Sequence, residues 1–162
     1  MSGRTLETVL KPVARRLASA PWFAKIGPKV VPPLDRALHR ISGGRLLLPQ
    51  LVLPSMVLTT TGSRTGLPRQ TPLICMPEDD GSFVIVGSNF GREGHPAWTG
   101  NLLRQAKAEV SYRGRTIPVT AELLEGADRD EVWPRLIRVW SVYDTYVERA
   151  GRRLRVFRLT PS

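Results

Sequence analysis

Hydrophobic residues alternate with polar ones, or form short runs bounded by glycine and proline, over most of the chain from Leu51 onward. A period of two is typical of strands that bury one face. The pattern predicts six strands, at residues 56–60, 70–76, 83–88, 109–112, 116–124 and 153–159. Asp80-Gly81 suits a tight hairpin between the second and third strands, and Gly114 marks the turn between the fourth and fifth.

Helical spacing replaces this alternation near the start of the chain. Residues 6–17 place leucine and valine three or four positions apart, which predicts an amphipathic helix. Three prolines then interrupt the pattern and are expected to break the chain before a second, short helix at residues 34–41, ended by Gly43-Gly44. The prolines are Pro28, Pro32 and Pro33.

Two further helices are expected between the strands. Pro96 suits the first position of a helix that continues to residue 106. Asp128 or Asp130 is expected to begin a long helix that ends near Gly151. Strands interrupted by two helices and closed by a terminal strand predict an α+β fold, a small antiparallel barrel with helices at its side.

The long helix carries a row of large side chains. Trp133 and Ile137 are expected in the core, because large apolar groups at helical spacing normally pack inward. Trp140, Tyr143 and Tyr146 each have a polar group on an apolar ring, so together they can line a half-wet pocket.

A glycine-rich loop follows the first predicted strand. Gly62 and Gly66 allow a close backbone approach to a ligand, and hydroxyl and guanidinium donors surround them, which favours a phosphate socket. The donors are Ser63, Arg64, Thr65 and Arg69. The alternative interpretation is a solvated turn. The loop is not the phosphate loop of a nucleotidase, because no Gly-Lys-Ser/Thr follows at the required spacing.

The net charge of +10 is concentrated at the start of the chain, where residues 1–50 carry nine lysines and arginines against Glu7 and Asp35. Such a basic arm suggests an anionic partner. With Trp22-Phe23 beside it, the amphipathic helix is consistent with peripheral contact with an anionic membrane. The alternative is a helix packed on the barrel with its charges in water. No nucleic-acid-binding motif accompanies the charge.

Length and composition set the remaining limits. The 162 residues suit a basic helical arm at 1–50 and a cofactor-binding barrel at 51–162. The single cysteine, Cys75, lies in an apolar run and is expected to be a buried thiol. No metal site is expected, because His39 and His95 lack acidic neighbours at ligand spacing. No signal peptide or membrane span is recognisable, so a cytoplasmic protein, possibly on the inner face of the membrane, is expected. The oligomeric state stays open.

Several motifs in order resemble the deazaflavin-dependent nitroreductase family of flavin and deazaflavin oxidoreductases. They are Thr59-Thr60-Thr61-Gly62-Ser63-Arg64-Thr65-Gly66 with Pro68-Arg69, a strand ending in Ser88-Asn89, then Pro96, Trp98 and Asn101-Leu102, and a Trp/Tyr-rich helix closing with an arginine. The resemblance covers about residues 51–161. It implies a split β-barrel of the FMN-binding type, coenzyme F420 as cofactor with FMN less favoured, and hydride transfer to a quinone-like, nitro or other planar hydrophobic acceptor.

The resemblance also implies roles for particular residues. Ser63, Arg64 and Thr65 would hold the cofactor phosphate and Arg69 its acidic tail. The deazaflavin ring would touch Ser88, Asn89, Pro96, Trp98 and Asn101. Trp140, Tyr143 and Tyr146 would cover the substrate, and Tyr143 or Tyr146 would donate the proton that follows the hydride.

Three departures from the family pattern affect these expectations. Ser63-Arg64 stands where relatives often have two basic residues, Phe90 where glycine is common, and Trp140 where tyrosine is common. The last of these puts nitroimidazole reduction in doubt. An alternative function is a non-catalytic split barrel that holds a fatty acid, haem or another small molecule, because the fold alone does not fix the activity.

Overall fold

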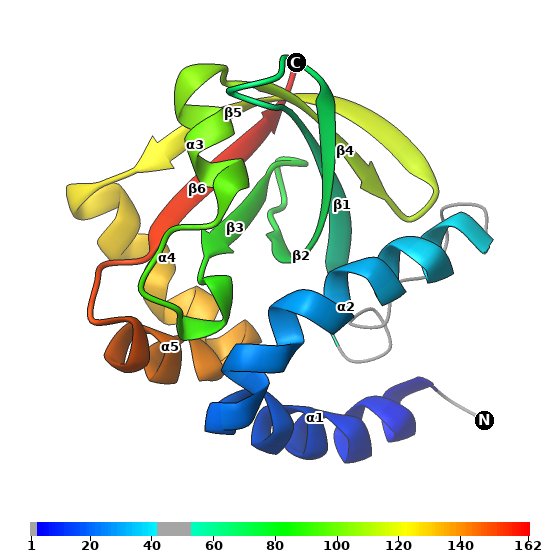
Figure 1. Cartoon of the computed structure of the whole chain (residues 1–162), viewed down its shortest axis with the longest axis vertical. Coiled ribbons are helices and arrows are strands. Elements are labelled where there is room, and N and C mark those ends of the chain that lie inside the picture. The colour runs from blue at the N-terminus through cyan, green and yellow to red at the C-terminus, as the bar shows by residue number, and fades with distance from the viewer. Residues whose placement is uncertain (1–2, 42–52) are drawn as a thin grey trace.

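Six antiparallel strands form a closed barrel in a computed structural model that describes residues 3–41 and 53–162 (Figure 1). Around the barrel the strand order is β1-β2-β3-β6-β5-β4. The strands are β1 (Ser55–Thr61), β2 (Pro68–Pro77), β3 (Phe83–Gly87), β4 (Lys107–Tyr112), β5 (Arg115–Leu124) and β6 (Arg155–Pro161). All six lie where the alternation predicts them, so the α+β split-barrel prediction is confirmed.

The inside of the barrel is filled by alternate residues of its strands. In β3, Phe83 and Ile85 belong to the interior cluster, whereas Val84 and Val86 face the helices outside. Helix α3 (Ala97–Arg104) adds Trp98 to the interior, where its ring lies 5.7 Å from that of Phe157. Cys75 is buried in the same cluster, as predicted.

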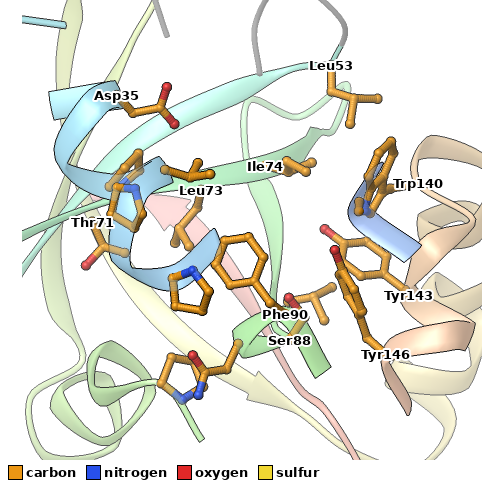
Figure 2. Close-up of a pocket in the computed structure, with 18 of the residues that line it drawn as sticks. Asp35, Leu53, Thr71, Leu73, Ile74, Ser88, Phe90, Trp140, Tyr143 and Tyr146 are labelled. Carbon is orange, nitrogen blue, oxygen red and sulfur yellow. The ribbon is translucent and has the colours of Figure 1, made fainter. Parts of the chain in front are cut away.

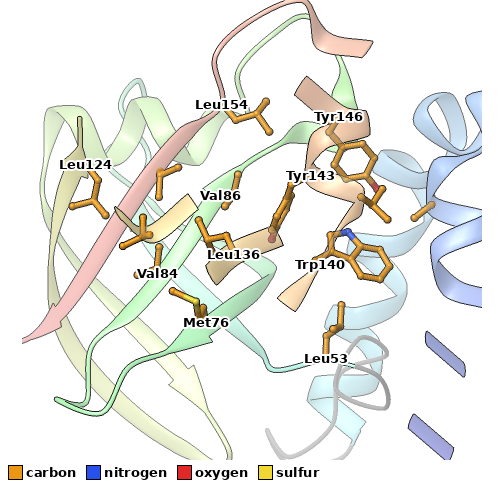
Figure 3. Packing of buried hydrophobic residues seen from close by; sticks show 14 of the residues in the cluster. Leu53, Met76, Val84, Val86, Leu124, Leu136, Trp140, Tyr143, Tyr146 and Leu154 are labelled. Atoms are coloured by element: carbon orange, nitrogen blue, oxygen red, sulfur yellow. The ribbon is translucent and has the colours of Figure 1, made fainter. Parts of the chain in front are cut away.

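A second hydrophobic cluster joins the outside of the barrel to α4 (Gly126–Val139) and α5 (Val142–Ala150), as Figure 3 shows. Leu136 of α4 and Tyr143 of α5 pack with Val84 and Val86 of β3. Because both faces of β3 are covered, all five of its residues are buried.

The prediction of one long helix up to Gly151 is wrong, because α4 and α5 are separate helices. Trp140 has an extended backbone (φ −145°, ψ 91°) that ends α4. Its indole is 5% exposed, and tertiary packing of this side chain overrides local helix propensity. α5 ends, as expected, at a left-handed Gly151 (φ 62°).

The prediction that prolines break the N-terminal arm is also wrong. The arm consists of α1 (Gly3–Ser19) and α2 (Pro21–Ile41), and α2 continues through Pro28, Pro32 and Pro33. Proline removes a helical hydrogen bond and favours a kink, but packing of the helix can hold it together. α2 contacts α1, β2 and residues 89–91, which supplies such packing. Gly43-Gly44 and the expected boundary at residue 50 fall outside the described residues.

The arm lies against the rest of the molecule. α1 contacts α5, and α2 contacts β2 and the short 3₁₀ helix η2 (Asn89–Gly91). Figure 1 shows α1, α2, α4 and α5 gathered at one end of the barrel. Among the described residues, no helix has the length and hydropathy that a bilayer crossing requires.

Candidate functional site

The glycine-rich loop forms a compact turn between β1 and β2. The Gly62 amide donates to the Leu67 carbonyl, and the Gly66 amide donates to the Gly62 carbonyl, both at 2.8 Å. Gly66 has a φ of 68°. A Cβ at position 62 would lie 2.8 Å from the Thr65 hydroxyl oxygen and 3.1 Å from the Leu67 carbonyl oxygen, so a side chain there would displace the Thr65 hydroxyl.

Asn101 fixes this loop to α3. Its Oδ1 accepts a hydrogen bond from the Ser63 amide, and its Nδ2 donates to the Thr60 hydroxyl, both at 3.0 Å. The side chain is buried, so the bonds are shielded from water. Asn101 therefore holds the Ser63 amide in place, and its contact with the cofactor stays a prediction.

A polar cavity of about 690 Å³ opens beside the loop. Four basic side chains line it, and the lining includes no carboxylate. They are Arg64, Arg69, Arg155 and His95. The Arg155 guanidinium donates to the Thr99 hydroxyl at 3.0 Å, and the Arg69 guanidinium donates to the Thr65 hydroxyl at 3.4 Å. These side-chain donors make up a set that suits an anion.

His95 enters this cavity as a neutral group. The Arg152 guanidinium lies 3.0 Å from its Nδ1, which must accept because arginine only donates. Burial foremost, and then the charges of Arg152 and Arg155, lower the pKa of His95 from its usual 6.5. The ring therefore carries its proton on Nε2 near neutral pH.

An apolar cavity of about 390 Å³ adjoins the polar one, and Thr71, Pro96 and Trp98 line both. Figure 2 shows the aromatic side chains of α5 and its preceding turn along one side, with α2 and β2 across from them. Pro96 immediately precedes α3, whereas the sequence predicts it at the first position of that helix.

The two tyrosines of α5 differ in acidity. Burial raises the pKa of Tyr143 far above the usual value of 10. Burial also raises the pKa of Tyr146, to about 12, but the charge of Arg149 and a hydrogen bond with Trp140 oppose the rise. The indole N–H of Trp140 can only donate, so the phenol oxygen of Tyr146 accepts and its own O–H stays available as a donor.

Several residues that line this cavity are outside the predicted set of site residues. Phe23 and the buried carboxyl group of Asp35, which is 1% exposed, come from α2, and Phe90 comes from η2. In the sequence, the signal for Asp35 is a single acidic residue among the apolar positions of a helix. The prolines of α2 obscure the helical spacing of those positions.

Every residue predicted for the site lines one of the two cavities. The polar cavity includes Ser63, Arg64, Thr65, Arg69 and Asn101; the apolar cavity includes Ser88, Asn89, Trp140, Tyr143 and Tyr146; Pro96 and Trp98 line both. The roles of these residues stay predictions. Within residues 3–41 and 53–162, no group of three or more His, Cys, Asp or Glu is placed to hold a metal ion.

Comparison with known proteins identifies relatives of the whole barrel and part of α2. The family model of F420H(2)-dependent quinone reductases matches residues 35–161. A protein of Mycobacterium tuberculosis named F420H(2)-dependent quinone reductase is 30% identical over 137 residues, which cover 78% of this chain and 87% of that protein.

Two solved structures also match this chain. The structure of an F420-H2 dependent reductase, FDR-A, superimposes with a TM-score of 0.60 and 30% identity over 65% of this chain and 93% of the other. A structure described as a domain-swapped dimer gives a TM-score of 0.63 and 27% identity, and covers 78% of this chain and 96% of the other.

These matches confirm the predictions of an F420-dependent oxidoreductase, of coenzyme F420 as its cofactor and of the resemblance on which both rested. Nitro-compound reduction and membrane contact stay predictions. With a family model that covers most of its length and a close relative at 30% identity, the chain belongs to the F420H(2)-dependent quinone reductase family.

Proposed function

We propose that this protein transfers a hydride from reduced coenzyme F420 to a quinone held in the apolar cavity. The observation that carries the proposal is the junction of two cavities of opposite character at Thr71, Pro96 and Trp98. One cofactor with an anionic tail and a planar ring can occupy both. Its tail lies among cations while its ring lies beside the acceptor.

The polar cavity fits the anionic part of the cofactor. Ser63, Arg64 and Thr65 surround a tight turn whose backbone can approach a phosphate closely. Arg69 and Arg155 add two guanidinium groups for an acidic tail. A tail of this kind is a feature of F420 that FMN lacks, so the number of cations supports F420 over FMN.

The junction between the cavities fits the ring. Pro96 and Trp98 lie there, Ser88 and Asn89 follow on the side of the apolar cavity, and Asn101 fixes the loop on the other side. When bound, the deazaflavin supplies the hydride. The protein therefore has to bind, orient, exclude water and provide a proton.

The apolar cavity fits a planar acceptor. Reduction of a quinone carbonyl to a hydroquinone consumes one hydride and one proton. We assign the proton to the Tyr146 hydroxyl, whose O–H bond breaks as the new O–H bond of the product forms; solvent then reprotonates the tyrosine. Trp140 and Tyr143 would cover the acceptor. We expect a quinone to suit this site better than a nitroimidazole, because Trp140 stands where relatives often have a tyrosine and supplies no hydroxyl.

Titration of the purified protein with F420 and with FMN, followed by fluorescence, tests the cofactor. We expect F420 to bind more tightly, and F420H2 to be oxidised faster with a menaquinone analogue than with a nitroimidazole. Binding of haem or a fatty acid without measurable F420 binding would instead support the non-catalytic alternative.

We propose further that the outer face of α2 binds anionic membranes peripherally. Trp22, Ile26, Val30 and Leu34 follow one another at every fourth position, and each is 49–52% exposed. Exposed lysines and arginines flank this apolar stripe: Lys25, Lys29, Arg36 and Arg40. An exposed apolar stripe with basic borders suits the interface of an acidic bilayer. The inner face of the same helix lines the cavity, so attachment would bring the cavity close to a membrane-dissolved quinone.

Vesicle co-sedimentation tests this attachment. Lys25→Ala with Lys29→Ala should weaken binding to vesicles of anionic lipid by roughly 30-fold at low salt, because each lysine near such a surface contributes about 1 kcal/mol. Trp22→Ser with Ile26→Ser should also weaken it. Leu103→Ser, which changes an equally exposed leucine on α3, is the matched control. Equal binding of all variants, or binding to neutral vesicles alone, would refute the proposal.

A further inference from the structure

Three successive residues of η2 have left-handed backbone angles, and the conformation is unfavourable for Phe90. Asn89, Phe90 and Gly91 have φ values of 48°, 57° and 77°. Glycine adopts this left-handed region freely, but a bulky side chain such as that of Phe90 rarely does. Strain of this kind is often found where the surrounding structure uses it for binding.

Contacts from the C-terminal side of the chain keep η2 in place. A Cβ on Gly91 would lie 3.2 Å from the Tyr146 Cα, so η2 packs directly on α5. The Arg152 guanidinium donates to the carbonyls of Gly87, Ser88 and Gly94 at 3.0–3.4 Å. Because these contacts fix the backbone on both sides of Phe90, the strain cannot relax locally.

The fixed backbone sends the Phe90 ring into the apolar cavity, where it meets the N-terminal arm. Its ring centroid lies 5.7 Å from that of Phe23 at an interplanar angle of 66°, an edge-to-face pair. Phe23 itself lies over Gly27, where a Cβ would be 3.0 Å from its ring. Figure 2 shows Phe90 between the α2 side of the cavity and Tyr146.

We propose that Phe90, closed against Phe23, determines which quinones enter the cavity. The Phe90 ring takes up space beside Tyr146 that a broad acceptor would need. One-ring quinones therefore fit with the ring in place, and three-ring quinones are disfavoured. This inference rests on the proposed function, because it concerns the acceptor of the same site.

Competition between two acceptors tests the proposal. In Phe90→Gly and Phe90→Ala, the ratio of kcat/KM for phenanthrenequinone to that for a short-chain benzoquinone should rise about ten-fold. Phe23→Ala should change the ratio in the same direction, since it removes the other half of the pair. Leu103→Ala, which changes an exposed residue of α3 that lines neither cavity, is the control and should leave the ratio unchanged.

A binding measurement separates this inference from the proposed function. Quenching of tryptophan fluorescence by each oxidised quinone, with no F420 present, should show about ten-fold tighter binding of phenanthrenequinone to Phe90→Gly and no comparable gain for the benzoquinone. Failure of the wild-type protein to bind F420 would overturn the proposed function. It would leave the quinone-binding measurement, and with it the role of Phe90, unaffected. Unchanged quinone affinities in all three variants would overturn the role of Phe90.

The two Phe90 variants also test the strain. Glycine accepts a φ of 57° without penalty and alanine does not. Phe90→Gly should therefore have a higher Tm than Phe90→Ala, although both lack the ring. A higher Tm for the alanine variant would show that the left-handed conformation is not enforced and that the ring is not held in place.

Discussion

Tyr146→Phe is expected to lower the turnover of a quinone by about 100-fold or more, because loss of a general acid typically costs two to four orders of magnitude. F420 affinity should change little, since the hydroxyl acts in the chemical step. Single-turnover mixing of F420H2-loaded enzyme with a menaquinone analogue measures the effect directly.

Tyr143→Phe is the matched comparison, and its effect should be smaller. Tyr143 is buried, with a pKa raised above that of Tyr146, so its hydroxyl is the poorer acid. Because the pKa of Tyr146 is raised to about 12, the phenol stays protonated and able to donate through the neutral range. Turnover limited by this acid should not fall between pH 7 and 9. Full activity in Tyr146→Phe would remove this tyrosine from the mechanism.

Arg64→Ala and Arg155→Ala should each weaken F420 binding by about ten-fold or more, since a charge-assisted hydrogen bond contributes ~1.5–3 kcal/mol. Arg155 is held toward the polar cavity by its bond to Thr99, whereas Arg64 is exposed and must be ordered by the ligand. The larger loss is therefore expected for Arg155. Fluorescence titration at low and high salt measures both.

Arg115→Ala controls for the loss of a charge. Arg115 is exposed at the start of β5 and lines neither cavity. An equal loss of affinity in this variant would mean that F420 affinity depends on the net charge of the protein and not on particular side chains of the polar cavity. Unchanged affinity in both Arg64→Ala and Arg155→Ala would place the cofactor elsewhere.

The barrel could be predicted from sequence because its strands obey local rules. β2 and β3 alternate or run apolar between turn residues, and Asp80-Gly81 marks the hairpin that joins them. These signals need no knowledge of the neighbouring strands.

The helices were less predictable because their limits depend on tertiary contacts. No helix-ending residue stands at Trp140, and the break coincides with burial of its side chain in the cluster that joins α4, α5 and the barrel. Likewise, Pro28 and Pro32 indicate an interruption, whereas α2 is a continuous helix that contacts α1, η2 and β2.

Some site residues could likewise be predicted from the sequence, and others could not. The glycine loop, Pro96, Trp98 and the tyrosines were identified by motif and family resemblance, and the fold brings them together. Arg155 was missed because its place depends on strand pairing: it lies opposite Gly87 in the β3–β6 register. Phe23 and Asp35 were missed because they reach the cavity from an arm with no motif of its own.

The strand order of the barrel has a consequence for how the molecule assembles. β6 pairs with β3 on one side and with β5 on the other, yet it follows both along the chain. Until β6 is in place, these two strands present unpaired N–H and C=O groups, the kind of edge that recruits strands of other molecules. Addition of residues 155–161 therefore covers both strand edges at once, and a chain without this segment would leave both exposed.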